Sequence, residues 1–123
     1  MKLLNVVLFA ENYQALIDWY KDVLALEVIQ EESGEYSYAE LGIDKQLILG
    51  ITPAKEVNHV ASSPRNNSSV MQLEVAEIHS LFNRVKEKSG EFLFGPTADE
   101  KYGFLYGAIS DIEGNQIWIV EGN

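Results

Sequence analysis

The chain has 123 residues, of which 46% are hydrophobic and 11% aromatic, so it can bury the core of one domain. Nineteen acidic residues against nine basic ones give a net charge of −10, which disfavours nucleic acids and anionic membranes as partners. The chain has no cysteine, so disulfides, thiolate metal sites and a cysteine nucleophile are excluded. It shows no signal peptide and no apolar run of membrane-spanning length, and we expect a cytoplasmic location.

The first half of the chain predicts a strand, a helix and three further strands. A β-rich run covers residues 3–9, and Asn12 is then placed to cap a helix over residues 13–24. Apolar residues recur through this helix at the spacing of one buried face. Apolar runs bounded by turn residues predict strands over residues 26–31, 36–42 and 46–52. The order is βαβββ.

The second half repeats this order after a connection over residues 53–67, which is rich in Pro, Ser and Asn. A strand over residues 69–75 leads to a helix over residues 77–88, and Gly90 suits the left-handed position after a helix. Strands are then expected at about residues 91–94, 104–111 and 116–121.

The two halves also match position by position. Aligning them places Leu8 on Leu73 and Leu16 on Leu81, so apolar residues fall on apolar residues although identity is low. We therefore predict an α+β domain over residues 1–123, built from two βαβββ modules over residues 1–52 and 68–123.

Two blocks of the sequence form recognisable motifs. The opening block is NVVLFAEN at residues 5–12 followed by WYKDVLAL at residues 19–26. The closing block comprises Gly95-Pro96, Gly103 and DIEGNQIWIVE at residues 111–121. Together they resemble the vicinal-oxygen-chelate superfamily, which groups glyoxalases, extradiol dioxygenases, fosfomycin-resistance enzymes and bleomycin-resistance proteins. The resemblance implies curved sheets that enclose one cavity, within a homodimer that pairs or exchanges modules between its chains.

Enzymes of this superfamily chelate a divalent metal through the first and last strands of each module. The resemblance places these four positions at Asn5, Ile48, Val70 and Trp118, and a register slip would replace Ile48 by Gly50. Val, Ile, Gly and Trp offer no donor, and one Asn amide is a poor ligand for a transition metal. We therefore predict no catalytic metal, no cofactor and no catalytic residue, which favours a non-enzymatic role.

Strand alternation from these positions predicts which side chains line the cavity. The expected lining residues are Asn5, Val7, Phe9, Ile48, Val70, Gln72, Gln116 and Trp118. Tyr102, Phe104 and Tyr106 are expected at its rim, with Tyr36 and Tyr38. Glu121 should point to the opposite face from Trp118, whereas Glu74 shares a face with Gln72. A mostly apolar pocket with a few amides is suited to stacking a flat organic ligand.

Three functions remain open at this point. The first is a metal-free homodimer of the glyoxalase and bleomycin-resistance type that binds a small aromatic or cationic molecule. The second is a metal-dependent lyase or isomerase with atypical ligands, drawn from Glu74 and from His59 of a second chain. The third is a structural dimer in which aromatic residues fill the cavity.

The end of the first helix departs from the superfamily pattern. The superfamily often shows Leu-Gly where this chain has Leu24-Ala25. If the backbone is left-handed there, Ala25 costs about 1 kcal/mol relative to Gly.

Overall fold

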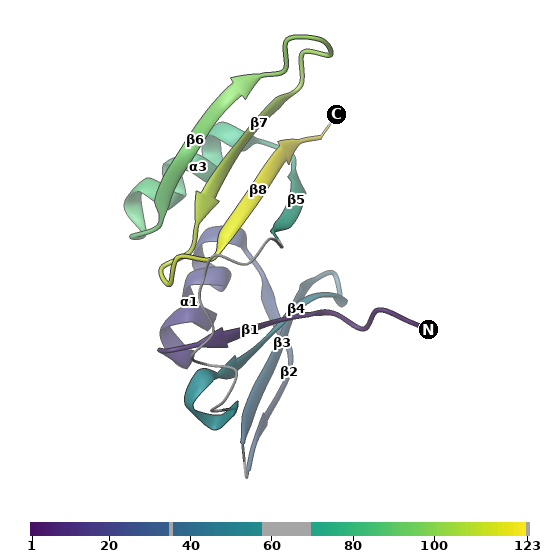
Figure 1. Cartoon of the computed structure of the whole chain (residues 1–123), viewed down its shortest axis with the longest axis vertical. Helices are drawn as coiled ribbons and strands as arrows, with labels where there is room; N and C mark the ends of the chain where they lie inside the picture. The colour runs from purple at the N-terminus through teal and green to yellow at the C-terminus, as the bar shows by residue number, and fades with distance from the viewer. Residues whose placement is uncertain (35, 58–69, 123) are drawn as a thin grey trace. The chain divides into compact units, whose positions relative to one another are not determined.

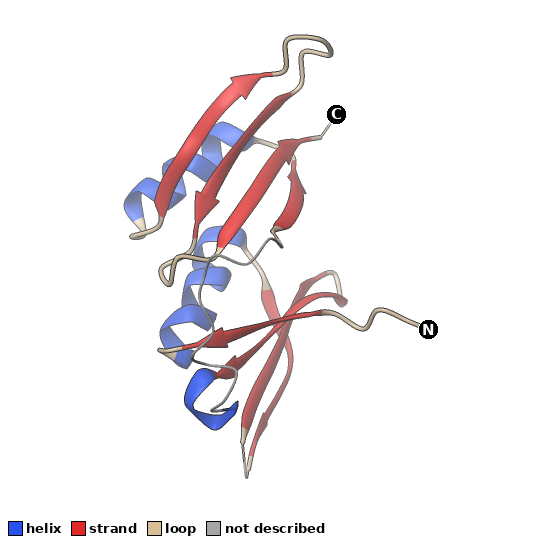
Figure 2. Cartoon of the chain, in the orientation of Figure 1, coloured by secondary structure: helices blue, strands red, loops and turns tan. Residues whose placement is uncertain are grey.

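The computed structural model describes residues 1–34, 36–57 and 70–122 (Figure 1). These residues form two compact units, the first within residues 1–64 and the second within residues 65–123. Each unit is a four-stranded mixed sheet with an α-helix, in the order βαβββ, so the predicted α+β fold is confirmed (Figure 2). No helix of the described residues is long and apolar enough to cross a membrane.

The first unit has the strand order β1-β4-β3-β2, with β1 parallel to β4 and the other neighbours antiparallel. Its elements are β1 (Val6–Ala10), α1 (Tyr13–Leu24), β2 (Glu27–Ser33), β3 (Ser37–Ile43), β4 (Gln46–Pro53) and the 3-10 helix η1 (Ala54–Val57). The core lies between α1 and the sheet, where Leu16, Leu41 and Ile51 are fully buried. Burial of these side chains is the main force that fixes the helix on this face.

Both ends of α1 are formed as the sequence predicts. The Asn12 side chain accepts a hydrogen bond from the Ala15 N–H at 3.3 Å, which satisfies one of the free donors of the first turn. Ala25 has φ 57° and ψ 31°, and its N–H donates to the Tyr20 carbonyl. The helix therefore ends on a left-handed alanine, a conformation in which Cβ is strained.

The second unit has the strand order β5-β8-β7-β6, with β5 parallel to β8. Its elements are β5 (Met71–Val75), α3 (Ile78–Glu87), β6 (Glu91–Ala98), β7 (Leu105–Ser110) and β8 (Gln116–Glu121). Ile117 and Ile119 on β8 are fully buried, as are Ile78 and Val85 on α3. The helix packs so close that a Cβ at Gly107 would lie 2.7 Å from Phe82 Cζ.

The turn between β7 and β8 is built around a buried carboxylate. Asp111 Oδ1 accepts hydrogen bonds from the N–H groups of Glu113 and Asn115 at 2.9 and 3.0 Å, and Oδ2 accepts from Asn115 Nδ2 at 2.8 Å. Gly114 has φ 87°, which a side chain would disfavour. This turn was expected from the sequence, and it sets the start of β8 at Gln116.

The structure differs from the prediction at two points in the second unit. β6 extends to Ala98 rather than ending at residue 94, because it is an edge strand and an edge tolerates the missing N–H of Pro96. The left-handed residue after α3 is Ser89, with φ 71°, and not Gly90. The reason is that α3 ends at Glu87, one residue earlier than expected, so the chain turns before it reaches the glycine.

The left-handed alanine gives a stability prediction. Ala25→Gly should raise the free energy of unfolding by about 0.5–1 kcal/mol, because glycine adopts positive φ without Cβ strain. Ala15→Gly inside the same helix is the matched control and should lower it by a similar amount. Urea denaturation of both variants measures the two changes. A loss of stability in Ala25→Gly would contradict the strain at this position.

A second prediction concerns alkaline pH. Burial, and then the adjacent Glu31 carboxylate, raise the pKa of Tyr13 from 10.0 to about 12, and the Tyr13 hydroxyl donates to Glu31 Oε2 at 3.2 Å. Because the folded pKa lies above the unfolded one, this contribution to stability is present below pH 10 and is lost as pH rises towards 12. Urea midpoints between pH 9 and about pH 11 should therefore fall less steeply in Tyr13→Phe than in the unmodified protein. Equal slopes of the urea midpoint against pH in the two proteins would contradict the raised pKa of Tyr13.

Candidate functional site

One face of each sheet packs on a helix, and we call the other its open face. In the first sheet, Ala39 and Ile51 are fully buried and in register. Glu31 is in register with Ala39 and accepts a hydrogen bond from Tyr13 of α1, so this row of residues across the strands faces the helix. Neighbouring residues along each strand point the opposite way. The open face of the first sheet carries Asn5, Val7, Phe9, Gln30, Glu32, Tyr38, Glu40, Ile48, Gly50 and Thr52.

A polar network connects three of these residues. Asn5 Nδ2 donates to the Tyr38 hydroxyl at 2.9 Å, and the hydroxyl donates to Glu40 Oε2 at 3.4 Å. All three side chains are partly buried. Asn5, which the resemblance placed at a metal position, therefore has its amide engaged by a tyrosine of the same unit.

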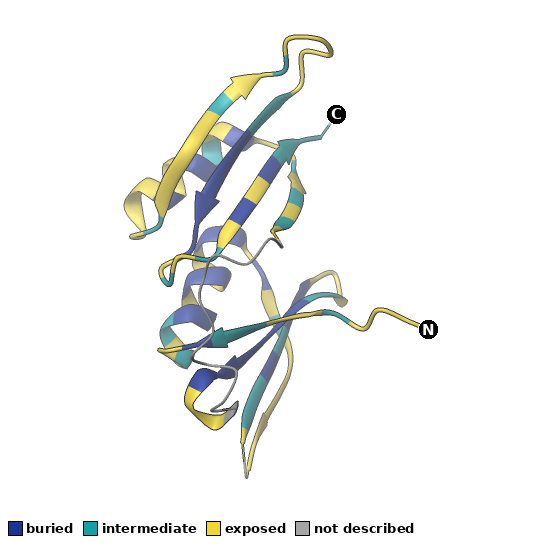
Figure 3. Cartoon of the chain, in the orientation of Figure 1, coloured by how far each residue is buried: buried dark blue, intermediate teal, exposed yellow. Residues whose placement is uncertain are grey.

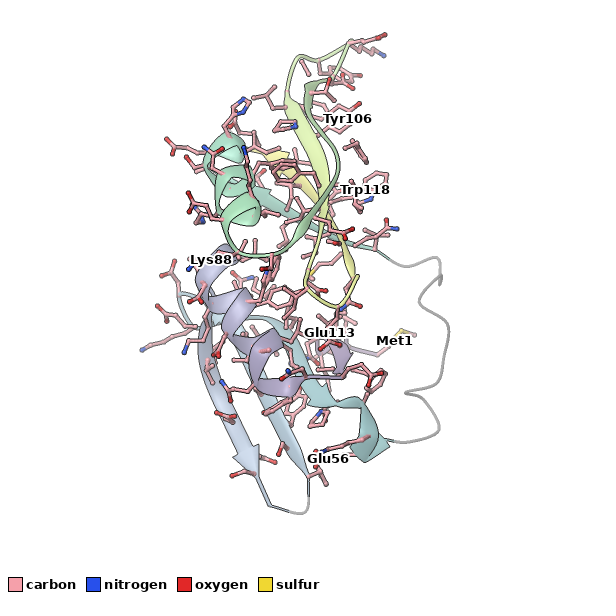
Figure 4. All side chains as sticks on the ribbon, turned by 90° about the vertical axis from the view of Figure 1, so that its left-hand side faces the viewer. Met1, Glu56, Lys88, Tyr106, Glu113 and Trp118 are labelled. Carbon is pink, nitrogen blue, oxygen red and sulfur yellow. The ribbon has the colours of Figure 1, made fainter. Side chains whose placement is uncertain are left out.

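The open face of the second sheet carries four aromatic side chains in contact, which we call the aromatic cluster: Phe94, Phe104, Tyr106 and Trp118. The Phe94 ring lies 5.9 Å from Trp118 at 88° and 5.9 Å from Tyr106 at 70°, and Phe104 lies 5.9 Å from Tyr106. These are edge-to-face or tilted contacts, which aromatic rings prefer. Figure 4 shows Tyr106 and Trp118 on the side of the sheet away from α3.

The aromatic cluster remains accessible to solvent in the chain. Trp118 is 43% exposed, whereas its neighbours Ile117 and Ile119 are fully buried, an alternation visible along β8 in Figure 3. Phe94 and Phe104 are similarly exposed. A Trp ring outside the core of its own unit retains apolar surface that a ligand or another chain can cover.

The predicted second-module residues take the following places. Phe104, Tyr106 and Trp118 belong to the aromatic cluster, and Gln72 is in register with Trp118 on the adjacent strand. Gln116 is exposed on the same face of β8, and Val70 is exposed just before β5. Tyr102 lies in the loop after β6, where the Lys101 Nζ is 5.1 Å from its ring centroid. The expectation that both modules line one cavity stays a prediction.

The hydrogen-bonded group and the aromatic cluster each contain one residue that was missed from the sequence, Glu40 and Phe94 respectively. Alternation from Phe92, which stacks on Phe82 of α3 at 5.4 Å, would place Phe94 on the helix side as well. A register shift between Phe92 and Phe94 instead turns Phe94 to the open face, opposite Ala108. The place of Glu40 on the open face could have been predicted, because it lies two residues from Tyr38 on the same strand.

The acidic residues show no common metal site in the part of the chain that is described. Residues 1–34, 36–57 and 70–122 contain no group of three or more His, Cys, Asp or Glu that could hold a metal ion. Glu121 Oε2 accepts the Ile78 N–H at 3.0 Å, so it caps α3 and points away from Trp118. Glu74 is exposed beside Gly122, and His59 lies outside the described residues.

Comparison with solved structures supports the fold. A hypothetical protein from S. aureus has a TM-score of 0.80 at 17% identity, with 99% of this chain and 95% of that chain covered. A glyoxalase-related enzyme from Fulvimarina pelagi has a TM-score of 0.76 at 13% identity, with coverage of 98% and 88%. A glyoxalase family protein from Enterococcus faecalis has a TM-score of 0.72 at 20% identity, with coverage of 98% and 97%. At these identities the likeness is one of fold.

Comparison with known sequences and sequence families shows to which family the chain belongs. No curated protein matches this chain in a sequence search. The family model described as Glyoxalase/Bleomycin resistance protein/Dioxygenase superfamily matches residues 2–119, which is nearly the whole chain. With its two βαβββ units and this match, the chain belongs to the Glyoxalase/Bleomycin resistance protein/Dioxygenase superfamily.

Proposed function

We propose that the protein is a metal-free homodimer that binds a small flat organic molecule on the aromatic cluster. The observation that carries this proposal is the 43% exposure of Trp118 within a group of four aromatic rings in mutual contact. A ring that covered about 100 Å² of this apolar surface would gain roughly 2.5 kcal/mol. The mutual contacts hold the four rings in place before a ligand arrives, which lowers the entropy cost of binding.

Polar groups beside the aromatic cluster are suited to orienting such a ligand. Gln72 is in register with Trp118 across the β5 and β8 pair, so the two backbones lie about 4.8 Å apart and both side chains project from the same face of the sheet. Gln116 lies two residues from Trp118 on the same face. A mostly apolar site with a few amides fixes a ligand's orientation while stacking supplies most of the binding energy.

The absence of a metal is proposed from the donor chemistry of this chain. The resemblance to the superfamily assigns its four metal positions to Asn5, Ile48, Val70 and Trp118, and only the first carries a side chain with a lone pair to donate. The Asn5 amide donates to Tyr38 at 2.9 Å. A divalent transition metal needs imidazole, carboxylate or thiolate ligands, which this set does not supply.

The homodimer is proposed from apolar side chains that the single chain leaves exposed on edge strands. Val6 and Val7 on β1 and Phe92 and Leu93 on β6 are exposed, and both strands are edges of their sheets. Exposed apolar edges favour pairing with another chain. A structural dimer with a filled cavity is the alternative, and it would cover Trp118 completely.

Ligand binding is tested through the fluorescence of Trp118. The chain has two tryptophans, and Trp19 is only 4% exposed, so Trp19→Phe leaves Trp118 as a single reporter. Titration with flat aromatics, starting with ethidium and quinoline, should change its emission and saturate. The matched control Trp118→Leu keeps Trp19 and should show neither change nor saturation. Equal responses in the two variants, or none from Trp118, would refute the proposed site.

The metal-free proposal has its own test. Protein purified without chelators should contain no stoichiometric nickel, zinc, iron or manganese by elemental analysis, because the four positions lack donors. Prolonged dialysis against EDTA should leave its thermal unfolding temperature unchanged. One bound metal ion per chain would instead support the lyase or isomerase alternative.

A further inference from the structure

The open face of the first sheet contains a hydrogen-bonded group that the aromatic cluster does not explain. The group consists of Asn5, just before β1, and of Tyr38 and Glu40 on β3. Their side chains meet over β4, the strand that lies between β1 and β3. Asn5 Nδ2 donates to the Tyr38 hydroxyl at 2.9 Å, and that hydroxyl donates to Glu40 Oε2 at 3.4 Å. Both hydrogen bonds therefore run in the same direction, from the Asn5 amide through the Tyr38 hydroxyl to the Glu40 carboxylate.

Gly50 provides the space in which this group forms. It is in register with Glu40 on one side and with Val7 on the other. A Cβ at position 50 would lie 2.5 Å from the Tyr38 hydroxyl oxygen and 2.8 Å from Asn5 Nδ2. The Tyr38 ring therefore occupies the volume in which any side chain at position 50 would project. The same glycine excludes a metal-binding side chain at this position and fixes the tyrosine.

The Glu40 carboxylate is the last acceptor of this group, and few polar groups of the protein contact it. Its side chain is partly buried, and among the described residues its one hydrogen-bond partner is the Tyr38 hydroxyl, at 3.4 Å. That distance is near the outer limit of a hydrogen bond. In the described strands β1 to β4 no residue is Lys or Arg. A partly buried carboxylate with one long hydrogen bond has lost hydration without gaining an equivalent partner.

We propose that Glu40 and Tyr38 form a subsite that binds the protonated nitrogen group of a ligand, either an amidinium, a guanidinium or a primary ammonium. The Glu40 carboxylate accepts one N–H, and the Tyr38 oxygen keeps a lone pair that accepts a second. Charge-assisted hydrogen bonds of this kind are stronger than neutral ones. The net charge of −10 draws cations towards the protein. The subsite lies wholly within the first unit and goes beyond the proposed function, which concerns the second unit.

The experiment compares two probes of nearly equal shape and different charge, benzamidinium and benzamide. Each is titrated into the ¹⁵N-labelled full-length protein at low ionic strength, and dissociation constants are obtained from backbone amide and indole N–H shifts. Benzamidinium should bind roughly three- to tenfold more tightly than benzamide. The shifts specific to benzamidinium should be largest at the amides of Tyr38, Glu40 and Gly50.

Two variants separate a specific contact from the general charge of the protein. Glu40→Gln keeps an acceptor for the Tyr38 hydroxyl and should reduce the preference for benzamidinium to less than about twofold. Glu32→Gln removes the same unit of charge from the same face, where Glu32 contacts Gln30 at 3.5 Å, and should leave the preference unchanged. If Glu40→Gln does not fold, the map of benzamidinium-specific shifts in the unmodified protein decides the question.

The outcomes also distinguish this subsite from the proposed function. An equal loss of preference in Glu40→Gln and Glu32→Gln, or no benzamidinium-specific shift at Tyr38 and Glu40, overturns the subsite. In that case a response of the Trp118 indole to both probes still supports binding on the aromatic cluster. A preference that depends on Glu40 while Trp118 responds to neither probe supports the subsite and overturns the role of the aromatic cluster.

Discussion

Each four-stranded sheet of this chain packs on a single α-helix, and one helix covers only one face. Strand alternation then divides every strand into a buried row and an open row. In β8 this division separates the buried pair Ile117 and Ile119 from the exposed Trp118. Most of the candidate site residues on strands take their positions from this division, whereas Phe94 reaches the open face through a register shift in β6.

The two open faces have different chemistry, although their units share one plan. The first carries a hydrogen-bonded amide, hydroxyl and carboxylate at Asn5, Tyr38 and Glu40. The second carries four aromatic rings in contact around Phe94. The aromatic face suits a flat ring, whereas the polar face suits a protonated nitrogen group.

Local patterns in the sequence were sufficient for most of the fold. The Asn12 cap, the left-handed Ala25 and the turn at Gly114 are set by residues within a few positions of each other, and they were predictable. The bulge that turns Phe94 to the open face depends on pairing between β6 and β7, which alternation within one strand does not contain. The contact of Tyr38 with Asn5 depends on an empty volume above a neighbouring strand, and it was missed for the same reason.

Ligand binding on the aromatic cluster requires that the open face of the second sheet is accessible in solution and not filled by packing. Acrylamide quenching of the single tryptophan in Trp19→Phe measures this accessibility, because acrylamide is small and uncharged and quenches exposed indoles more strongly than buried ones. Strong quenching of Trp118, well above that of Trp19 measured in Trp118→Leu, is the predicted result. Equal protection of the two tryptophans would contradict this accessibility and identify the aromatic cluster as part of a packed core.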